Sequence, residues 1–438
     1  MSAPATVAPP AANTGSDADV RAMLRAEYAL SASTGAAFGL LFFAGAFARI
    51  VLGASDGDVA LIKMAPHVGL VCTLVVGALA AGRHKVPWVV WPNLASRAAM
   101  VAAGFALSAS PFVWLVVLAF ALQSLSDPAR TALYQANLPG AHRGAMVGAV
   151  RAAQALVRLS VAGVAAACLH AWPESYRVLY PAIGLVSLLL VWPYRRAPDR
   201  LDGDAPAPAL RAALRQTALV LVRDRPFARF MGLWFVFGLA NLMSMPLMVL
   251  LLDAVAKPLG PGPAAAHAAV LLNVVPPLLW LVTLGPWGRV LDRTGPVAMR
   301  GPLNIVWALC PLWWGAWPLL VAAGAVPSGW FGLGPVAVIL LGFYVGQVMQ
   351  GFAHGGTQLI WTLGVVPYAR DAEDAASYMA VHTTLTGIRG LIAPPLALLV
   401  AAAVGLEATL IGCGVVMALT GVLTMWLERE PGGRGRAG

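Results

Sequence analysis

The chain has 438 residues, of which 59% are hydrophobic and only 11% are charged. A soluble protein usually has about a quarter of its residues charged, and this chain has too little polar surface to cover a soluble core. The net charge of +10 is divided among short basic clusters between apolar stretches. That pattern indicates membrane topology rather than a nucleic-acid-binding face, so composition predicts an integral membrane protein and excludes a soluble enzyme.

The N-terminal segment up to about Asp19 is rich in Ala, Pro and Ser and contains no apolar run. A cleaved signal peptide would begin with basic residues followed by an apolar stretch. We therefore predict that residues 1–26 form a disordered tail. The four cysteines lie far apart, and their spacing matches neither a metal site nor a disulfide framework, so no metal or other cofactor is predicted.

Apolar stretches long enough to cross a bilayer, roughly 20 helical residues each, recur along the rest of the chain. Six precede a polar interval, at roughly 28–52, 59–81, 86–107, 109–135, 143–169 and 175–194. Six follow it, at roughly 227–253, 265–288, 297–324, 334–362, 375–404 and 406–427. The sequence thus predicts an all-α membrane protein with about twelve transmembrane helices. They form two six-helix bundles (27–195 and 227–428), with a linker (196–226) and a C-terminal tail (429–438).

The basic residues are distributed unevenly between the two sides of the predicted membrane protein. About 20 fall at the termini and the even-numbered loops, and about 3 fall at the odd-numbered loops (Lys63, Arg177 and Lys257). Because cytoplasmic loops carry the excess of Lys and Arg, both termini and the linker are predicted to be cytoplasmic. We expect a monomer in the inner (cytoplasmic) membrane, with the lipid bilayer and a small-molecule substrate as its partners.

The two halves contain traces of a repeat. NLPGAHRGAMVGAVRAAQALVR follows the fourth predicted helix, and VVPYARDAEDAASYMAVHTTLTGIR follows the tenth. With one constant offset, Arg151 falls on His382 and Arg158 falls on Arg389. Residues seven apart lie on one face of a helix, so each half would present two polar groups on one face. Parallel six-helix repeats are the architecture of one large transporter class.

A short motif in the second half adds a family resemblance. GPWGRVLDRTGP, after the eighth predicted helix, resembles the signature loop of the major facilitator superfamily, Gly-x-x-x-Asp-Arg-x-Gly followed by a basic residue. The match falls on Gly288, Asp292, Arg293 and Gly295, with Pro296 in place of the basic residue. With six plus six helices and a basic central loop, the chain resembles a secondary transporter of this superfamily over nearly its whole length. The resemblance implies two bundles that rock about a central site.

The first copy of the motif departs from the family pattern. The loop after the second predicted helix reads GALAAGRHKVP, which keeps Gly77, Arg83 and Lys85 but has Ala81 where the family has an acidic residue. This departure leaves open a transporter-like scaffold or sensor without transport activity. The fifth helix also lacks the Gly/Pro-rich motif of drug–proton exchangers, which argues against multidrug efflux.

Asp292 has two interpretations. By pseudo-symmetry it faces the start of the fifth helix near Arg143 and Gly144, where unpaired N–H groups and the helix dipole favour a negative charge. Such a contact would hold the two halves closed on one side. In the alternative, Asp292 is a turn residue, and Gly295 supplies a positive φ. The motif favours the gating interpretation.

Ionisable residues inside predicted helices are few, and they usually face a cavity or a partner. Asp127 is the only carboxylate well inside a predicted span, and Arg97 and Arg130 lie at similar depth. Asp127 either pairs with one of these arginines and helps to pack the first bundle, or carries the coupling proton of a transport cycle.

Arg158 and Arg389 fall near the middle of the fifth and eleventh predicted helices. An arginine at this depth does not discharge by losing a proton, so it needs a carboxylate, a carbonyl cluster, water or an anion. With one intramembrane acid for several arginines, the sequence indicates an anionic ligand, either an organic acid or a phosphorylated solute. In the alternative, these arginines only line a wet vestibule.

The tenth predicted helix has a polar face made of Gln347, Gln350, His354, Thr357 and Gln358. His354 either carries protons or serves as a hydrogen-bonding partner. We expect the substrate site to consist of Arg158, Arg389, Asn241, Gln350, His354 and His382.

Together these features predict secondary active transport of a small organic or phosphorylated anion by alternating access, coupled to protons through Asp127 or His354. No Gly-rich phosphate-binding loop is present, so the chain is not expected to hydrolyse ATP. A membrane-embedded enzyme is disfavoured, because the sequence has no His-Glu-x-x-His, Gly-x-Ser-x-Gly or paired-carboxylate arrangement in or beside a span.

Overall fold

The computed structural model describes residues 16–200, 209–260, 267, 270–272, 274–326 and 334–429. Over these residues the chain is helical, without strands, and eleven helical stretches are long and apolar enough to cross a membrane. A further helix, α5 (Val86–Ala103), packs against α6 and α9. Its mean hydropathy is lowered by Asn93 and Arg97. With α5 included, the predicted number of crossings is reached.

The first half of the chain supplies six membrane segments. The first consists of α1 (Asp17–Leu41) and α2 (Ala44–Leu52), and the second of α3 (Asp56–Val71) and α4 (Thr73–Ala80). After α5, the fourth segment consists of α6 (Ala109–Ser124) and α7 (Asp127–Asn137). The fifth and sixth are α8 (Arg143–Ala171) and α9 (Tyr176–Val191).

The second half begins after two short helices, α10 (Leu210–Ala218) and α11 (Val220–Arg223). Its membrane segments are α12 (Arg225–Ala256), α14 (Val275–Thr294), α15 (Pro296–Ala322), α16 (Pro335–Leu363), α17 (Ala372–Val404) and α18 (Leu406–Arg429).

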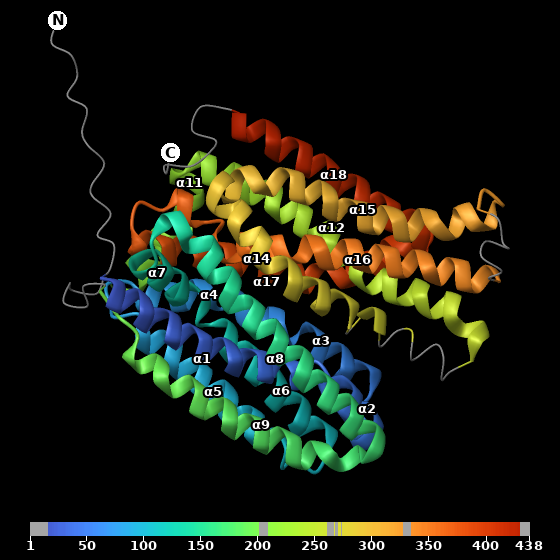
Figure 1. The fold of residues 1–438 in the computed structure, drawn as a ribbon, viewed down its shortest axis with the longest axis horizontal. Helices are drawn as coiled ribbons and strands as arrows, with labels where there is room; N and C mark the ends of the chain where they lie inside the picture. The colour runs from blue at the N-terminus through green and yellow to red at the C-terminus, as the bar shows by residue number, and fades with distance from the viewer. Residues whose placement is uncertain are drawn as a thin grey trace, which may run out of the picture.

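The two halves lie side by side as separate groups of helices, with α1–α9 on one side and α12–α18 on the other (Figure 1). One apolar cluster belongs wholly to the first group and includes Phe112 and Tyr180, and another belongs wholly to the second and includes Trp314. The largest cluster contains residues of both groups, for example Tyr134 and Phe227. Each bundle therefore has an apolar core of its own, and a third apolar core contains residues of both bundles.

The bundles meet along two seams. In one, α8 packs against α14, and in the other α17 packs against α3, α4 and α7. The first seam is close because glycines face each other: a Cβ on Gly288 would lie 2.7 Å from the carbonyl oxygen of Gly144. We call the end of the molecule where α1 and α8 begin and α14 and α18 end the terminal face (Figure 1).

The predicted disordered tail, residues 1–26, is wrong for residues 17–26, which form the start of α1. Ser16 caps this helix, because its hydroxyl oxygen accepts from the backbone N–H of Asp19 at 3.3 Å. Acidic side chains at Asp17 and Asp19 also favour a helix start, since they face the positive end of the helix dipole. Residues 1–15 lie outside the described residues.

The predicted linker, residues 196–226, contains α10, which packs against α4 and α17. Near the end of this segment, Asp224 caps α12: its carboxylate accepts from the backbone N–H of Phe227 at 3.0 Å and from the Tyr378 hydroxyl at 2.7 Å. Residues 201–208 of the linker and 430–438 of the C-terminal tail lie outside the described residues. The bundle and linker boundaries assigned from the sequence stay a prediction.

Candidate functional site

A cavity of about 560 Å³ lies between the two bundles, within the range of roughly 300–1,000 Å³ common for small-molecule sites. It is lined from one side by α1, α3 and α5–α8 and from the other by α12 and α14–α17. Much of the wall is aromatic and comes from both bundles: Phe38, Phe42, Trp234, Phe237, Trp280, Trp307 and Trp361.

Five of the six residues predicted to bind substrate line this cavity: Arg158, Arg389, Asn241, Gln350 and His354. The sixth, His382, lies behind the cavity wall and is 1% exposed. Its ring packs between those of Trp234 and Trp361, at centroid distances of 4.3 and 4.5 Å. The placement of His382 corrects the expectation that it contacts substrate directly, since the two tryptophans cover it.

The polar face of the tenth segment points into the cavity, where all five of its predicted residues contribute to the lining. Gln358 Nε2 donates to His354 Nε2 at 3.0 Å. The His354 ring also lies 4.6 Å from the Trp280 ring and 5.2 Å from the Trp307 ring, between centroids. This geometry fits the hydrogen-bonding interpretation of His354, and a proton-carrying role for it stays a prediction.

Arg158 reaches the cavity from α8 and contacts aromatic rings of both bundles. Its guanidinium carbon lies 4.3 Å from the Phe42 ring centroid in the first bundle and 5.7 Å from the Trp280 ring centroid in the second. Within the described chain, no carboxylate pairs with this guanidinium. The cation is therefore held by ring faces, which leaves its N–H groups available to a ligand.

Arg389 approaches from the other bundle, on α17. Its Nη1 donates to the backbone carbonyl of Trp234 at 2.7 Å, while its buried Nε has no partner among the described residues. It lies against Gly238 of α12, where any larger side chain would collide with the guanidinium. The repeat-based expectation that Arg158 and Arg389 occupy opposite bundles thus agrees with where the two side chains lie.

Several buried polar atoms of the cavity lining have no partner in the described chain. They are His67 Nδ1, Asn241 Oδ1, Trp280 Nε1, Gln347 Oε1, Thr357 Oγ1, Arg151 Nε, Arg389 Nε and all three side-chain nitrogens of Arg300. Native proteins leave few buried polar groups unsatisfied. Their concentration on one cavity makes it the candidate site for a polar ligand. Sequence reasoning missed Arg300 and His67 as lining residues.

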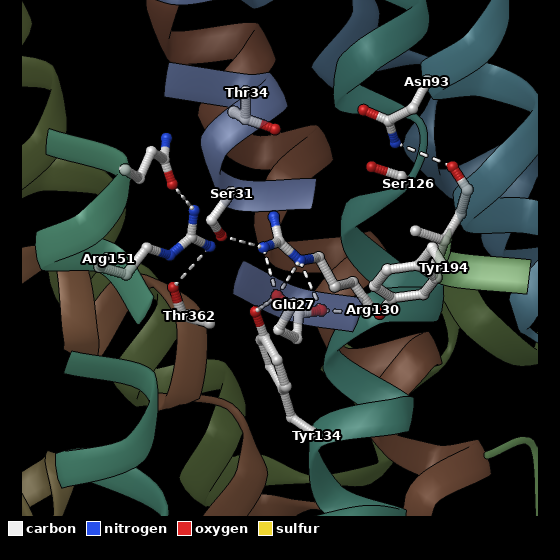
Figure 2. Close-up of polar contacts among 12 residues, drawn as sticks. Glu27, Ser31, Thr34, Asn93, Ser126, Arg130, Tyr134, Arg151, Tyr194 and Thr362 are labelled. Atoms are coloured by element: carbon white, nitrogen blue, oxygen red, sulfur yellow. Dashed lines mark hydrogen bonds and ion pairs between the residues drawn. The ribbon is translucent and has the colours of Figure 1, made fainter. Parts of the chain in front are cut away.

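The first bundle contains a buried ion pair that the sequence analysis did not predict (Figure 2). Glu27 of α1 is fully buried and accepts from Arg130 of α7, with Nη2 to Oε2 at 2.5 Å. It also accepts from the hydroxyls of Tyr134 and Tyr194, at 2.6 and 2.7 Å. Glu27, rather than Asp127, is thus the carboxylate that pairs with an intramembrane arginine.

Asp127 makes neither of the predicted pairings. Arg130 pairs with Glu27, and Arg97 donates to neutral groups such as Gln123 Oε1 at 2.6 Å and Ser33 Oγ at 3.0 Å. The Asp127 side chain instead lines the cavity, and it has no ion pair among the described residues. This position fits the proton-coupling interpretation, which stays a prediction.

Arg151 connects the bundles beside this network. Its Nη1 donates to Gln154 Oε1 at 2.8 Å, and its Nη2 donates across the interface to Thr362 Oγ1 of α16 at 3.3 Å (Figure 2). A side chain that lines the cavity therefore also bridges the two bundles.

The signature motif belongs to the last turns of α14 rather than to a loop, and only Gly295 lies in the turn itself, with φ of 78°. Asp292 caps the start of α8 in the other bundle. Its Oδ1 accepts from the backbone N–H of Gly144 at 2.6 Å, and its Oδ2 from that of Ala145 at 2.8 Å. The expected contact is present, and the adjacent Arg293 is exposed.

A second contact between the bundles lies at the terminal face, near Ala81. Lys85, which is fully buried, donates through Nζ to Glu373 Oε1 of α17 at 2.6 Å. The backbone N–H of Gly82 donates to the same oxygen at 3.3 Å. Burial lowers the pKa of the Lys85 ammonium, although the Glu373 carboxylate acts in the opposite direction. An acid is thus present at this seam, but it comes from the second bundle.

Comparisons with known proteins identify the fold. No protein-family model and no curated protein sequence matches the chain. The crystal structure of the human organic anion transporter MFSD10 (TETRAN) is similar, with a TM-score of 0.69 at 14% sequence identity, over 92% of this chain and 99% of that one.

Two other similar structures are symporters. The E. coli fucose:proton symporter FucP has a TM-score of 0.65 at 13% identity, over 92% of this chain and 98% of that one. The major facilitator superfamily proton:xylose symporter XylE, bound to 6-bromo-6-deoxy-D-glucose, has a TM-score of 0.65 at 11% identity, over 95% and 97%. The chain therefore has the fold of the major facilitator superfamily transporters, and the predicted fold class is confirmed. At these identities the similarity establishes the fold, while the ligand has to be inferred from the cavity.

Proposed function

We propose that this protein is a secondary transporter that carries an organic anion through the central cavity by alternating access. The observation that supports this most directly is the pair Arg158 and Arg389, which line one cavity from opposite bundles. Neither is neutralised by a carboxylate of the described chain. A ligand that contacts both would connect its own binding to the relative movement of the bundles.

The aromatic wall favours an organic anion over a small phosphorylated solute. Ring faces provide large apolar contact area, and the cavity holds such rings from both bundles, including Trp280 and Trp307. Among the proteins of similar fold, one is an organic anion transporter and two are proton:sugar symporters. The first of these agrees with the proposed substrate class, and the other two agree with proton coupling.

The Asp292 and Lys85–Glu373 contacts join the bundles at the terminal face. We propose that they close the cytoplasmic side in this conformation, because the excess of Lys and Arg assigns both termini to the cytoplasm. The membrane would be the inner (cytoplasmic) one. An impermeant thiol reagent added to intact cells should label a cysteine at Ser55 and spare one at Arg370, and the reverse pattern would contradict this orientation.

The experiment for the substrate class is a thermal-shift screen of the purified protein in detergent, with organic anions, sugars and organic cations at matched concentrations. Organic anions should raise the melting temperature, and the best of them should be taken up by proteoliposomes. Arg158→Gln and Arg389→Gln should remain folded and lose this response. Stabilisation by a sugar or a cation, unchanged in both variants, would contradict the anion proposal. Binding without any uptake or exchange would favour the scaffold or sensor alternative.

A further inference from the structure

Arg300 is a buried cation whose side-chain nitrogens all lack a hydrogen-bond partner in the described chain. It lies near the start of α15 and is 1% exposed. Its guanidinium carbon lies 4.0 Å from the Trp234 ring centroid and 4.7 Å from that of Phe237. None of its three nitrogens has a hydrogen-bond partner in the part of the chain that the structure describes, and the side chain lines the cavity. A buried, unpaired charge is strongly destabilising, so its presence requires a reason other than packing.

Arg389 contacts the same tryptophan. Arg300 stacks on the Trp234 ring, while Arg389 donates to the Trp234 backbone carbonyl. Arg389 is 6% exposed, and its Nε has no partner among the described residues. Two cations around one residue repel each other in a medium of low dielectric. A bound anion would remove this repulsion and satisfy the free N–H groups.

We infer that Arg300 and Arg389 form the subsite that holds the carboxylate of the transported anion, with Trp280 and Trp307 against its apolar body. This inference rests on the proposed function and adds the orientation of the bound ligand: the second bundle binds its charged end. The planar guanidinium fork fits the two oxygens of a carboxylate. Arg158 of the first bundle would then approach the same ligand from the opposite wall.

The test measures binding of naphthoate, of its neutral amide naphthamide, of acetate and of inorganic phosphate to the purified full-length protein, by quenching of tryptophan fluorescence. The wild type should bind naphthoate at least tenfold more tightly than naphthamide or acetate. Loss of one charge-assisted contact should weaken naphthoate binding by about 10- to 100-fold in Arg300→Gln and leave naphthamide binding unchanged.

The chain offers a matched control. Arg195 stacks on Trp192 with its guanidinium carbon 4.1 Å from the ring centroid, but it is exposed and outside the cavity. Arg195→Gln removes the same kind of arginine–tryptophan contact and should leave all four affinities at the wild-type values. A loss equal to that of Arg300→Gln would show a nonspecific effect and overturn the assignment.

A melting curve separates binding from a structural role. Arg300→Met keeps most of the side-chain volume and removes the unpaired charge, so the ligand-free variant should melt at or above the wild-type temperature. Naphthoate should stabilise the wild type but not this variant. A lower melting temperature without ligand, together with undiminished naphthoate binding, would make Arg300 a structural residue.

The subsite and the proposed function fail in different ways. If the wild type prefers naphthoate and loses that preference in Arg158→Gln but not in Arg300→Gln, the subsite is wrong and anion transport stands. If the wild type binds naphthamide as well as naphthoate, the proposed function itself fails. Tighter binding of phosphate than of naphthoate, or no naphthoate binding at millimolar concentration, would overturn the carboxylate class.

Discussion

The contact between Lys85 and Glu373 joins the bundles through one charge pair, so a single substitution can test whether it holds the terminal face closed. Lys85 Nζ donates to Glu373 at 2.6 Å and to the carbonyls of Ala80 and Arg83 at 2.6 and 2.9 Å. Glu373→Gln removes the negative charge and keeps the shape of the side chain. Because the Glu373 side chain is 39% exposed, solvent screening limits the loss to about 1 kcal/mol. The ratio of closed to open molecules should then fall about fivefold.

Spin labels at His84 and Arg370 would report this change, since both positions are exposed at the terminal face and belong to opposite bundles. In a cysteine-free background, pulsed electron spin resonance should show mainly a short distance in the wild type. Glu373→Gln should enrich a longer one about fivefold. Glu174→Gln is the matched control, because that carboxylate pairs with Arg177 within its own bundle. A folded Glu373→Gln protein with an unchanged distance distribution would refute the proposed role of the contact.

Three further substitutions test the second seam, the cavity and the coupling. Gly144→Ala should push the Asp292 carboxylate away from the start of α8, because the new Cβ would lie 2.6 Å from Asp292 Oδ1. The variant should therefore transport its substrate severalfold more slowly in proteoliposomes. Gly163→Ala on the same helix meets no atoms and should transport normally. Gly238→Ala should displace the Arg389 guanidinium, and fluorescence titration should show anion binding weakened tenfold or more. Gly232→Ala on the same helix has open space around it and should bind the anion normally. Asp127→Asn should abolish uptake driven by a proton gradient and preserve exchange of the solute across the membrane; proton-driven uptake at the wild-type rate would exclude it as the coupling group.

The membrane segments could be predicted because each must satisfy its own backbone hydrogen bonds in lipid, so each crossing is a long apolar helix. The polar face of α16 was predictable for the same local reason. Gln347, Gln350 and Gln358 share one side of a single helix whatever the rest of the chain does, and all three line the cavity.

The Glu27–Arg130 pair could not be read from the sequence, because it joins α1 and α7, whose residues are 103 positions apart. The sequence interpretation began the first span one residue after Glu27 and assigned the preceding charged residues to a tail. A signal was available at Ser16 and Asp19, which have the spacing of a helix cap. The turn that follows this cap is charged, so hydropathy alone does not extend the membrane span to it.

Arg300 was missed for a related reason. It follows the signature motif by a few residues, so it reads as a cytoplasmic basic residue near a loop. In the structure the turn at Gly295 is short, α15 begins at Pro296, and its first turns carry Arg300 into the bundle beneath Trp234. Trp234 and Phe237 of α12 lie against this arginine, and helices of both bundles complete the cavity that it lines.

At the seam near Ala81, where the family motif has an acidic residue, a different charge pair joins the two bundles. A contact of this kind between the bundles needs a carboxylate and a hydrogen-bond donor. The carboxylate can belong to the first or to the second bundle, provided that the donor belongs to the other. At the α8 seam the acid is Asp292 of the second bundle, and the donors are backbone N–H groups of the first. At the α17 seam the acid is again from the second bundle, Glu373, and Lys85 of the first is the donor. The departure at Ala81 therefore gives little support to the scaffold alternative, because this seam still has a charge pair that joins the two bundles.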